Sequence, residues 1–480
     1  MDKFFKFEKY GTNYRTETTA GLATFFTMAY IIFVNPNILS NSFGSQMPAN
    51  SVFVATVIAT VIGTLMLALY ANVPYAQAPG MGLNAFFSFT VCGAMGFTWQ
   101  QALAMVFICG IVGMIITATG LRKMLIQALP KTLQSAIGGG IGLFIAYIGM
   151  KSAGLLTFGG TAEGSTAGAD AIPALVNFSN PAVIVAAAGM LLIIVLLALK
   201  VTGAILLGII GTTVISLLVI AFGADASNFY PHLPQGSNIA AVFSGISVNP
   251  AQIGADIASV ADTAFKLDFG GIFAADKIAL TITALIGFVL TDIFDTVGTL
   301  IGTGKRTGIF ENEDFESGSG IRTRMDKALF ADLTATMTGA LCGTSNVTTY
   351  VESAAGIAEG GRTGFTSMVT AILFLLCLPL VSIVGIVPSV ATSPALIVVG
   401  VLMMAAITDI DWSDFSVAAV AFATMAFMPF AYSITTGISV GFIVYVLLKL
   451  VTGKIKEVKP IMLVFTLLFI LNFILMAIEL

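Results

Sequence analysis

Two polar, broken stretches in an otherwise apolar chain decide the fold: VPYAQAPGMGLN at residues 73–84 and GTSNVTTYVE at residues 343–352. Each begins with residues that favour extended or Pro/Gly-broken backbone and then leads into a helical pattern. A matching pair of interrupted hydrophobic segments in two halves of a membrane protein points to a transporter binding site. Because backbone cannot stay unpaired in lipid, we expect the two extended pieces to pair with each other or to line a cavity near mid-membrane.

The composition indicates an all-α polytopic protein of the inner or plasma membrane. Of 480 residues, 57% are apolar and 10% are charged, whereas soluble domains carry about 25% charged residues. The net charge of −4 gives no reason to expect a nucleic-acid partner. The four cysteines form no C-x-x-C pair, and His232 lies in a Pro-containing loop sequence. We therefore expect no metal and no cofactor, and we expect carboxylates to bind and release any transported proton.

The apolar segments form a seven-plus-seven pattern with a long polar interval between the halves. They lie near 18–40, 52–71, 75–95, 100–120, 133–151, 180–199, 203–222, 278–304, 325–341, 345–360, 364–385, 394–408, 413–430 and 432–451. Because seven is odd, the second half enters the membrane from the opposite side, so the repeats are inverted. The broken stretches fall in spans 3 and 10. A further apolar segment at 461–479 is either a fifteenth span or an interfacial helix.

The distribution of lysine and arginine predicts a cytoplasmic N-terminus. With that orientation most basic residues fall on the cytoplasmic side, as the positive-inside rule requires. The exceptions are Lys151, Lys266 and Lys277. The start of the chain has no signal-peptide pattern. The interval 223–277 then lies outside, and its stretch 251–265 fits either a helix on the membrane surface or a plain linker.

Acidic residues inside predicted spans are the strongest chemical signal. A charge at a helix centre costs about 2.5–3.5 kcal/mol on insertion scales, so each needs a reason. Asp292 and Asp295 lie three residues apart on one face of the eighth segment, and Thr299 continues that stripe. Two neighbouring carboxylates resist ionising together, which suits a proton carrier. The alternative is that one aspartate only bonds the broken backbone opposite it.

Glu352 has both a functional and a structural interpretation. Its carboxylate could accept N–H donors of a ligand, or it could close a capping box that begins at Thr349. Asn84 occupies the corresponding place in the first half and offers both a donor and an acceptor. Phe86 and Phe294 could stack on a planar ligand, although packing is the simpler role for either.

Other acidic residues have weaker signals. Asp332 is placed near the cytoplasmic start of a helix, and Asp409 at a membrane edge. We expect both to be solvated or to act as caps.

Three motifs resemble one family of transporters. QAPGMGLNAFF (77–87), DIFDTVGT (292–299) and TTYVESAAGI (348–357) are similar to the third, eighth and tenth spans of the azaguanine-type purine permeases. These form the adenine/guanine/hypoxanthine branch of the nucleobase–cation symporters, which are related to the nucleobase–ascorbate transporters. The stretches GTN (11–13) and TMAYIIFVNP (27–36) are also typical. Asp295 and Glu352 match the positions of the eighth- and tenth-span site residues in the related uracil and xanthine carriers.

The resemblance implies fourteen spans divided between a core and a gate domain. The core domain takes residues 1–120 and 278–385, the gate domain takes 121–222 and 386–480, and 223–277 is an external loop. It implies proton-coupled, elevator-like import of guanine, hypoxanthine or adenine, often by a homodimer in the lipid bilayer. We expect substrate contacts from Asn84, Phe86, Phe294, Asp295 and Glu352, and proton coupling by Asp292, Asp295 and Glu352.

Two competing classes remain to be weighed. An anion transporter of the same architecture should lack acids at its half-helix ends, where Asp295 and Glu352 would oppose an anion. An intramembrane aspartyl protease needs two aspartates about 3 Å apart on different helices, but Asp292 and Asp295 share one helix. We therefore expect a transporter and not an enzyme.

Overall fold

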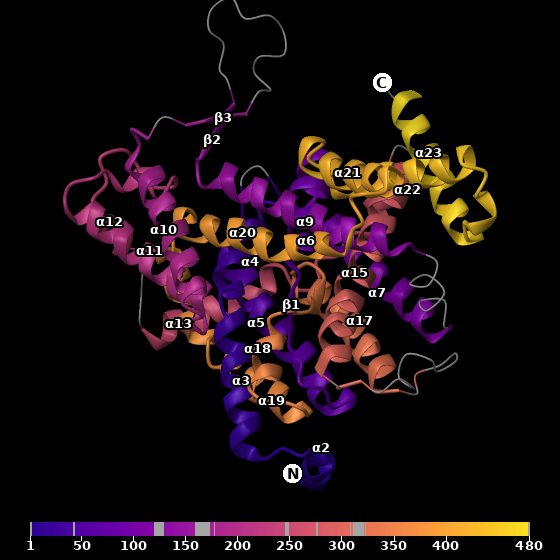
Figure 1. Cartoon of the computed structure of the whole chain (residues 1–480). Helices are drawn as coiled ribbons and strands as arrows, with labels where there is room; N and C mark the ends of the chain where they lie inside the picture. The colour runs from indigo at the N-terminus through magenta and orange to yellow at the C-terminus, as the bar shows by residue number, and fades with distance from the viewer. Residues whose placement is uncertain are drawn as a thin grey trace, which may run out of the picture.

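Helices follow the apolar segments in sequence order, and Figure 1 shows how they are arranged in space. The computed structural model describes residues 2–41, 44–119, 129–158, 173–176, 178–244, 249–274, 277–307, 309–310, 321 and 323–478. In addition, no side-chain environment is described for Phe294, Val297, 301–307 and a few residues near the termini and the short strands.

The first half contains the elements α1 (Asp2–Phe5), α2 (Phe7–Tyr10), α3 (Tyr14–Met28), α4 (Ile31–Leu39), α5 (Ala49–Met66), the π-helical η1 (Leu67–Ala71), β1 (Gln77–Pro79), α6 (Met81–Ala85), the π-helical η2 (Phe86–Ala94), α7 (Trp99–Ala118), α9 (Lys131–Ser152), β2 (Leu156–Phe158), β3 (Pro173–Leu175), α10 (Pro181–Ala198) and α11 (Ala204–Ala221).

The polar interval and the second half contain η4 (Ala226–Asn228), α12 (Ile239–Phe243), α13 (Pro250–Ala258), η5 (Ser259–Asp262), α14 (Phe269–Ile272), α15 (Ile278–Thr307), α17 (Arg324–Cys342), β4 (Val347–Thr349), α18 (Ser353–Ala358), α19 (Gly364–Leu375), η6 (Leu378–Ile386), α20 (Ser389–Met403), η7 (Met404–Asp409), α21 (Phe415–Phe430), α22 (Ile434–Val451), η8 (Ile455–Glu457) and α23 (Pro460–Ile478).

Within these described residues, nine helical stretches are long and apolar enough to cross a membrane. They are Tyr14–Leu39, Ala49–Ala71, Trp99–Ala118, Lys131–Ser152, Pro181–Ala198, Ala204–Ala221, Ile278–Leu300, Ser389–Asp409 and Ile434–Val451. The pair α19 and η6, bent by 58°, makes a tenth if it counts as one span. The prediction of a multi-pass helical protein is thus confirmed, while the count of fourteen crossings stays a prediction.

The helices pack as two groups. One group, here called the strand group, contains α3 to α7 and α15 to α19; its central contacts join α17 to α5 and α7, and α19 to α3 and α5. The other, here called the α9 group, contains α9 to α11 and α20 to α22; α20 and α21 both pack along α9. Figure 1 shows β1 near the middle of the molecule, close to α5 and α17.

The extra apolar segment forms α23, which packs on the end of the α9 group. The Phe469 and Phe442 ring centroids are 5.4 Å apart in an edge-to-face arrangement. The same helix also contacts α15 of the strand group. Exposed Leu467 and Leu471 lie on other parts of its surface. The segment is therefore a helix that touches both groups.

The polar interval holds short helices, and one of them bears on a choice left open by the sequence. Residues 251–265 include α13, which packs against η6 and α5. The Ser382 hydroxyl donates to the Asp256 carboxylate at 2.6 Å. The stretch is thus partly helical, with no residue of α13 buried, while its position on the membrane surface stays a prediction.

Candidate functional site

The two broken stretches cross as a pair of short antiparallel strands. In β1 and β4, Gln77 faces Thr349, Ala78 faces Thr348, and Pro79 faces Val347. Hydrogen bonds extend the pairing at each end, with the Gly80 N–H donating to the Asn346 carbonyl at 2.9 Å and the Tyr350 N–H to the Ala76 carbonyl at 3.0 Å. α6 and α18 begin directly after the two strands. The predicted pairing of the extended pieces is confirmed.

Glycine lets these elements approach closely. A Cβ on Gly80 would lie 2.7 Å from Thr348 Oγ1 and 3.3 Å from Asp295 Oδ2. A Cβ on Gly82 would lie 2.6 Å from Ile141 Cγ2 in α9. Real Cβ atoms are essentially never found at 2.6–2.7 Å from a neighbour, and 3.3 Å is already a tight contact. The two glycines of the 73–84 stretch therefore bring the crossing against both α15 and the α9 group.

Asp332 accepts hydrogen bonds from both strands of the crossing and from α15. It is 0% exposed, so the expectation of a solvated or capping residue was wrong. Its Oδ1 accepts from Gln77 Nε2 at 3.3 Å and from Thr349 Oγ1 at 3.0 Å. Its Oδ2 accepts from Thr296 Oγ1 at 2.8 Å. One carboxylate of α17 thus joins β1, β4 and α15, which is how a buried charge is tolerated.

Asp292 plays a similar part next to the beginning of β4. It is also 0% exposed. Its Oδ1 lies 3.2 Å from the Asn346 Nδ2 donor. The Thr336 hydroxyl is 3.3 Å from the same oxygen and 2.9 Å from the Val347 carbonyl, so it can donate to either. This arrangement fits the structural alternative raised from the sequence, in which one aspartate bonds the broken backbone opposite it.

Asp295 lies one turn further along α15 in a different environment. Its side chain is half-buried. Its Oδ2 accepts from Thr348 Oγ1 of β4 at 3.0 Å and lies next to Gly80. Of the two aspartates predicted to lie on one face of α15, Asp292 is therefore fully buried and Asp295 is half-buried.

Glu352 does not close a capping box. It occupies the N-cap position of α18 with helical backbone angles, and its side chain makes no capping hydrogen bond. Instead, its Oε1 accepts from the Tyr30 hydroxyl at 2.6 Å. Tyr30 is fully buried at the break between α3 and α4. The half-buried Glu352 carboxylate is therefore oriented by a tyrosine of the first span, which leaves the functional interpretation in place.

The remaining residues predicted to contact the substrate are Asn84, Phe86 and Phe294. Asn84 is fully buried, its Oδ1 accepts from the Ser345 hydroxyl, and its Nδ2 is 3.5 Å from the Pro79 carbonyl. Phe86 is also fully buried and packs edge-to-face on Phe288, with ring centroids 4.8 Å apart. The side chain of Phe294 lies outside the described residues. Stacking of Phe86 or Phe294 on a planar ligand stays a prediction.

Sequence reasoning missed two tyrosines of this site. Tyr30 orients Glu352, and the Tyr350 hydroxyl donates to the Pro79 carbonyl at 2.6 Å. Both lie inside motifs that were noted for other reasons, but a tyrosine in an apolar span has no sequence signal that separates it from packing. Together the two hydroxyls link the first span, β1 and the start of α18.

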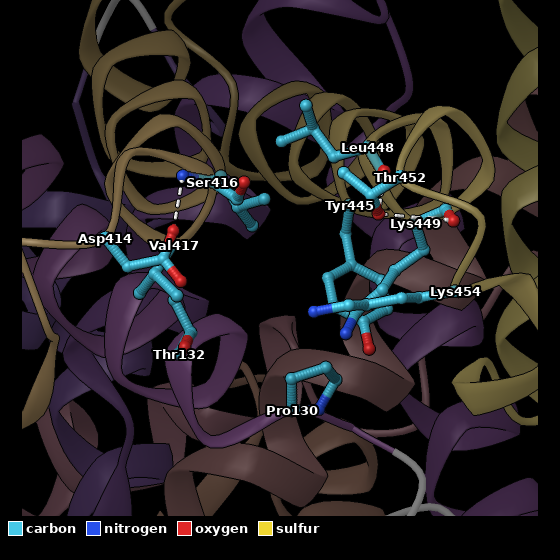
Figure 2. Close-up of a pocket in the computed structure, with 11 residues that line it drawn as sticks. Pro130, Thr132, Asp414, Ser416, Val417, Tyr445, Leu448, Lys449, Thr452 and Lys454 are labelled. Atoms are coloured by element: carbon cyan, nitrogen blue, oxygen red, sulfur yellow. Dashed lines mark hydrogen bonds between the residues drawn. The ribbon is translucent and has the colours of Figure 1, made fainter.

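A separate pocket of about 230 Å³ lies within the α9 group. Figure 2 shows residues from α21 and α22 on its walls and Pro130, which precedes α9, at its floor. Lys449 and Lys454 point into it, Asp414 lies on the other wall, and Glu457 is 2.5 Å from the Lys449 ammonium. The charges of this pocket are thus balanced, and none of the acids at the strand crossing lines it.

Comparison with known proteins identifies the family. The sequence model described as "Permease family" (Xan_ur_permease) matches residues 15–440. The chain belongs to this permease family. It is therefore a transporter and not an enzyme, which removes the protease hypothesis.

Curated relatives match nearly the whole permease. A putative permease, MJ0326, of Methanocaldococcus jannaschii is 41% identical over 474 residues, covering 99% of this chain and 98% of that one. The guanine/hypoxanthine permease PbuO of Bacillus subtilis is 38% identical, with 98% and 99% covered. The adenine permease AdeQ of Escherichia coli is 37% identical, with 99% and 96% covered.

Solved structures share the fold of the permease at low identity. The transmembrane domain of the cyanobacterial bicarbonate transporter BicA matches with a TM-score of 0.60 at 16% identity, covering 88% of this chain and 97% of that one. The murine anion transporter Slc26a9 in the inward-facing state also gives 0.60, at 11% identity, with 92% and 69% covered. At these identities the likeness concerns the fold alone.

Replacement of Asp332 tests its role at the crossing. Asp332→Asn removes the charge that accepts from three donors, and hydrogen bonds to charged groups contribute about 1.5–3 kcal/mol each. We expect a loss of at least about 3 kcal/mol of stability, seen as a lower melting temperature of the detergent-solubilised protein and little uptake. Asp409→Asn, which changes an exposed acid, is the matched control. A normal melting temperature for Asp332→Asn would contradict this account.

Proposed function

We propose that this permease imports purine nucleobases by proton symport through the strand crossing. The observation that carries the proposal is the pair of half-buried carboxylates, Asp295 and Glu352, which flank β4 from α15 and from the start of α18. Relatives that match nearly full length are named adenine and guanine/hypoxanthine permeases. Each of these purines presents ring N–H donors, and adenine and guanine add an exocyclic amino group, whereas an ionised carboxylate offers only acceptors. The chemistry of the pair therefore suits this class of substrate.

The four acids near the crossing differ in burial and in hydrogen bonding, and this difference supports the proposed location of the site. Asp292 and Asp332 are fully buried and accept from threonine, asparagine and glutamine donors of the crossing itself. In the part of the chain that the structure describes, Asp295 accepts from one side chain, Thr348, and Glu352 from one, Tyr30. They are thus the carboxylates with remaining capacity for a ligand or a proton.

The movement we propose is an elevator-like shift of the strand group, as the core domain, against the α9 group, as the gate domain. The packing of helices into these two groups supports it, because each group contacts itself more extensively than it contacts the other. Fourteen crossings, a cytoplasmic N-terminus and assembly as a homodimer belong to the same proposal. The inner or plasma membrane is its expected location.

A second candidate is anion transport, because the solved structures with the same fold include transporters of bicarbonate and other anions. Against it, two carboxylates border the crossing, and an anion placed between them would be repelled by both. Substrate competition separates the two candidates.

The first test is uptake of radiolabelled guanine by cells that express the permease. We expect unlabelled guanine, hypoxanthine or adenine to compete and bicarbonate to have no effect. Each proton that moves down a potential of 100 mV supplies about 2.3 kcal/mol, so an uncoupler should abolish accumulation above the external concentration. Accumulation that survives the uncoupler but requires sodium would contradict proton coupling. Competition by bicarbonate and not by purines would favour the anion candidate.

The second test separates Asp295 from Asp292. Asp295→Asn should nearly abolish uptake while leaving the protein folded, because only one hydrogen bond, from Thr348, depends on that side chain in the described structure. Asp292→Asn should lower the melting temperature, because it removes the charged acceptor of Asn346 Nδ2 next to β4, and it should reduce uptake less than Asp295→Asn. Uptake at matched surface levels and the melting temperature of the solubilised proteins measure both. Normal transport by Asp295→Asn with a dead Asp292→Asn would reverse the two roles.

The third test concerns Glu352. Glu352→Gln removes a charge-assisted acceptor worth roughly 1.5–3 kcal/mol, which corresponds to about a ten- to 150-fold loss of apparent affinity. Tyr30→Phe, which leaves the carboxylate but removes its 2.6 Å donor, should lower affinity less. Glu359→Gln, at an exposed acid at the end of the same helix, is the control. Wild-type affinity in Glu352→Gln would leave this residue without a role in binding.

A further inference from the structure

Lys151 is one of the few basic residues that the positive-inside rule does not explain. It lies in the last turn of α9, at the end that the proposed orientation places outside. Its side chain is half-buried, and its ammonium lies over the ring of Tyr432, 4.8 Å from the ring centroid. A lysine that faces an aromatic ring at the membrane boundary makes a cation–π contact. The structure thus places Lys151, which the positive-inside rule does not explain, against the ring of Tyr432.

Tyr432 itself lies in the short turn between α21 and α22. Its φ angle is +51°, a left-handed conformation that is uncommon for a residue with a Cβ and costs conformational energy. Its ring meets Phe144 and Tyr147 of α9, with centroids 5.5 Å and 6.2 Å away. The ring is therefore held in place by α9 on one side and by the ammonium of Lys151.

The same residue touches the strand group. The Phe89 ring of η2 lies 6.1 Å from the Tyr432 ring, and the Thr90 hydroxyl is 3.5 Å from the Tyr432 carbonyl. η2 continues from α6, so Phe89 follows Asn84 by about one and a half helical turns. Tyr432 is thus a point at which the two helix groups meet, a short distance along the helix from the strand crossing.

A second close approach joins the two groups near this point. A Cβ on Gly287 of α15 would lie 2.6 Å from Thr435 Oγ1, in the first turn of α22. The start of α22 therefore packs tightly against α15 as well as η2. Any separation of the two groups at this end must break the contacts that Tyr432 makes with η2.

We propose that Tyr432 and Lys151 form the outer gate of the transport path. This inference rests on the proposed function, because alternating access requires the two groups to separate on one side at a time. When the Tyr432 ring lies between Lys151 and Phe89, the outer route to the crossing is closed. When the strand group moves, the ring loses Phe89 and Thr90, and the route opens. The cation–π contact, whose two partners both belong to the α9 group, holds the ring in the position in which it meets Phe89.

Accessibility of a cysteine behind the gate tests the proposal. Thr90 is 1% exposed, and the Tyr432 turn covers it on the side where its hydroxyl is 3.5 Å from the Tyr432 carbonyl. Thr90→Cys would be introduced into a variant whose four native cysteines are replaced by serine or alanine. Labelling by a membrane-impermeant methanethiosulfonate reagent would then be timed on intact cells, without purine. With the gate residues intact we expect slow labelling.

Loss of the cation or the ring should open the gate. Lys151→Met and Tyr432→Leu should each raise the labelling rate about two- to thirty-fold, the shift that corresponds to losing a cation–π contact of about 0.5–2 kcal/mol. Lys151→Arg and Tyr432→Phe, which retain the cation and the ring, should label slowly. Lys266→Met, at an exposed lysine expected on the same face, is the matched control and should also label slowly.

Unchanged rates in both Lys151→Met and Tyr432→Leu would overturn the gate, as would labelling of Thr90→Cys only from the cytoplasmic face in inverted vesicles. The outcome is separable from the substrate assignment because no purine is present. If the substrate were wrong, purine uptake would be absent while the labelling pattern persisted. If the gate were wrong, uptake would be present while the labelling rates stayed equal.

Discussion

The constraint on which this structure depends is that a backbone N–H or carbonyl cannot be left unpaired in a membrane. Two apolar segments begin as short extended strands, at residues 77–79 and 347–349, and each strand supplies the partners that the other lacks. Such a pairing leaves the starts of two helices close to one point without exposing bare backbone to lipid. The close glycine contacts, the buried acids and the packing of α15 and α17 around the strands all follow from holding that crossing in place.

A three-residue strand pair is too short to be stable alone, so side chains from neighbouring helices complete it. Asp332 joins both strands and α15, and Asp292 holds the residue before β4. The cost of burying these carboxylates is offset by several donors aimed at each. Because the structural work is done by these two acids, we propose that Asp295 and Glu352 are the acids that take a ligand. A site of this kind separates the groups that hold its shape from the groups that can change protonation.

The sequence predicted the multi-pass helical class, the paired broken spans and the family, because these depend on local composition and on specific motifs. It misplaced Asp332, because distance from a helix start does not tell how deeply a side chain is buried. The capping box at Glu352 was plausible by spacing, but the tyrosine that meets the carboxylate lies 322 residues away. The second strand pair, Leu156–Phe158 with Pro173–Leu175, also went unpredicted. Contacts of this range are set by tertiary packing, for which a single sequence carries no spacing signal.

The pairing of β1 with β4 also has a consequence for biosynthesis. Gln77 and Thr349 are 272 residues apart, and ribosomes add about 5–20 residues per second. For roughly 15–50 s after β1 has left the ribosome, its partner does not yet exist. During that interval the first half must shelter an unpaired strand, either within the insertion machinery or against water. The nascent first half is therefore the form of this protein most exposed to quality control, and rapid synthesis of the second half protects it.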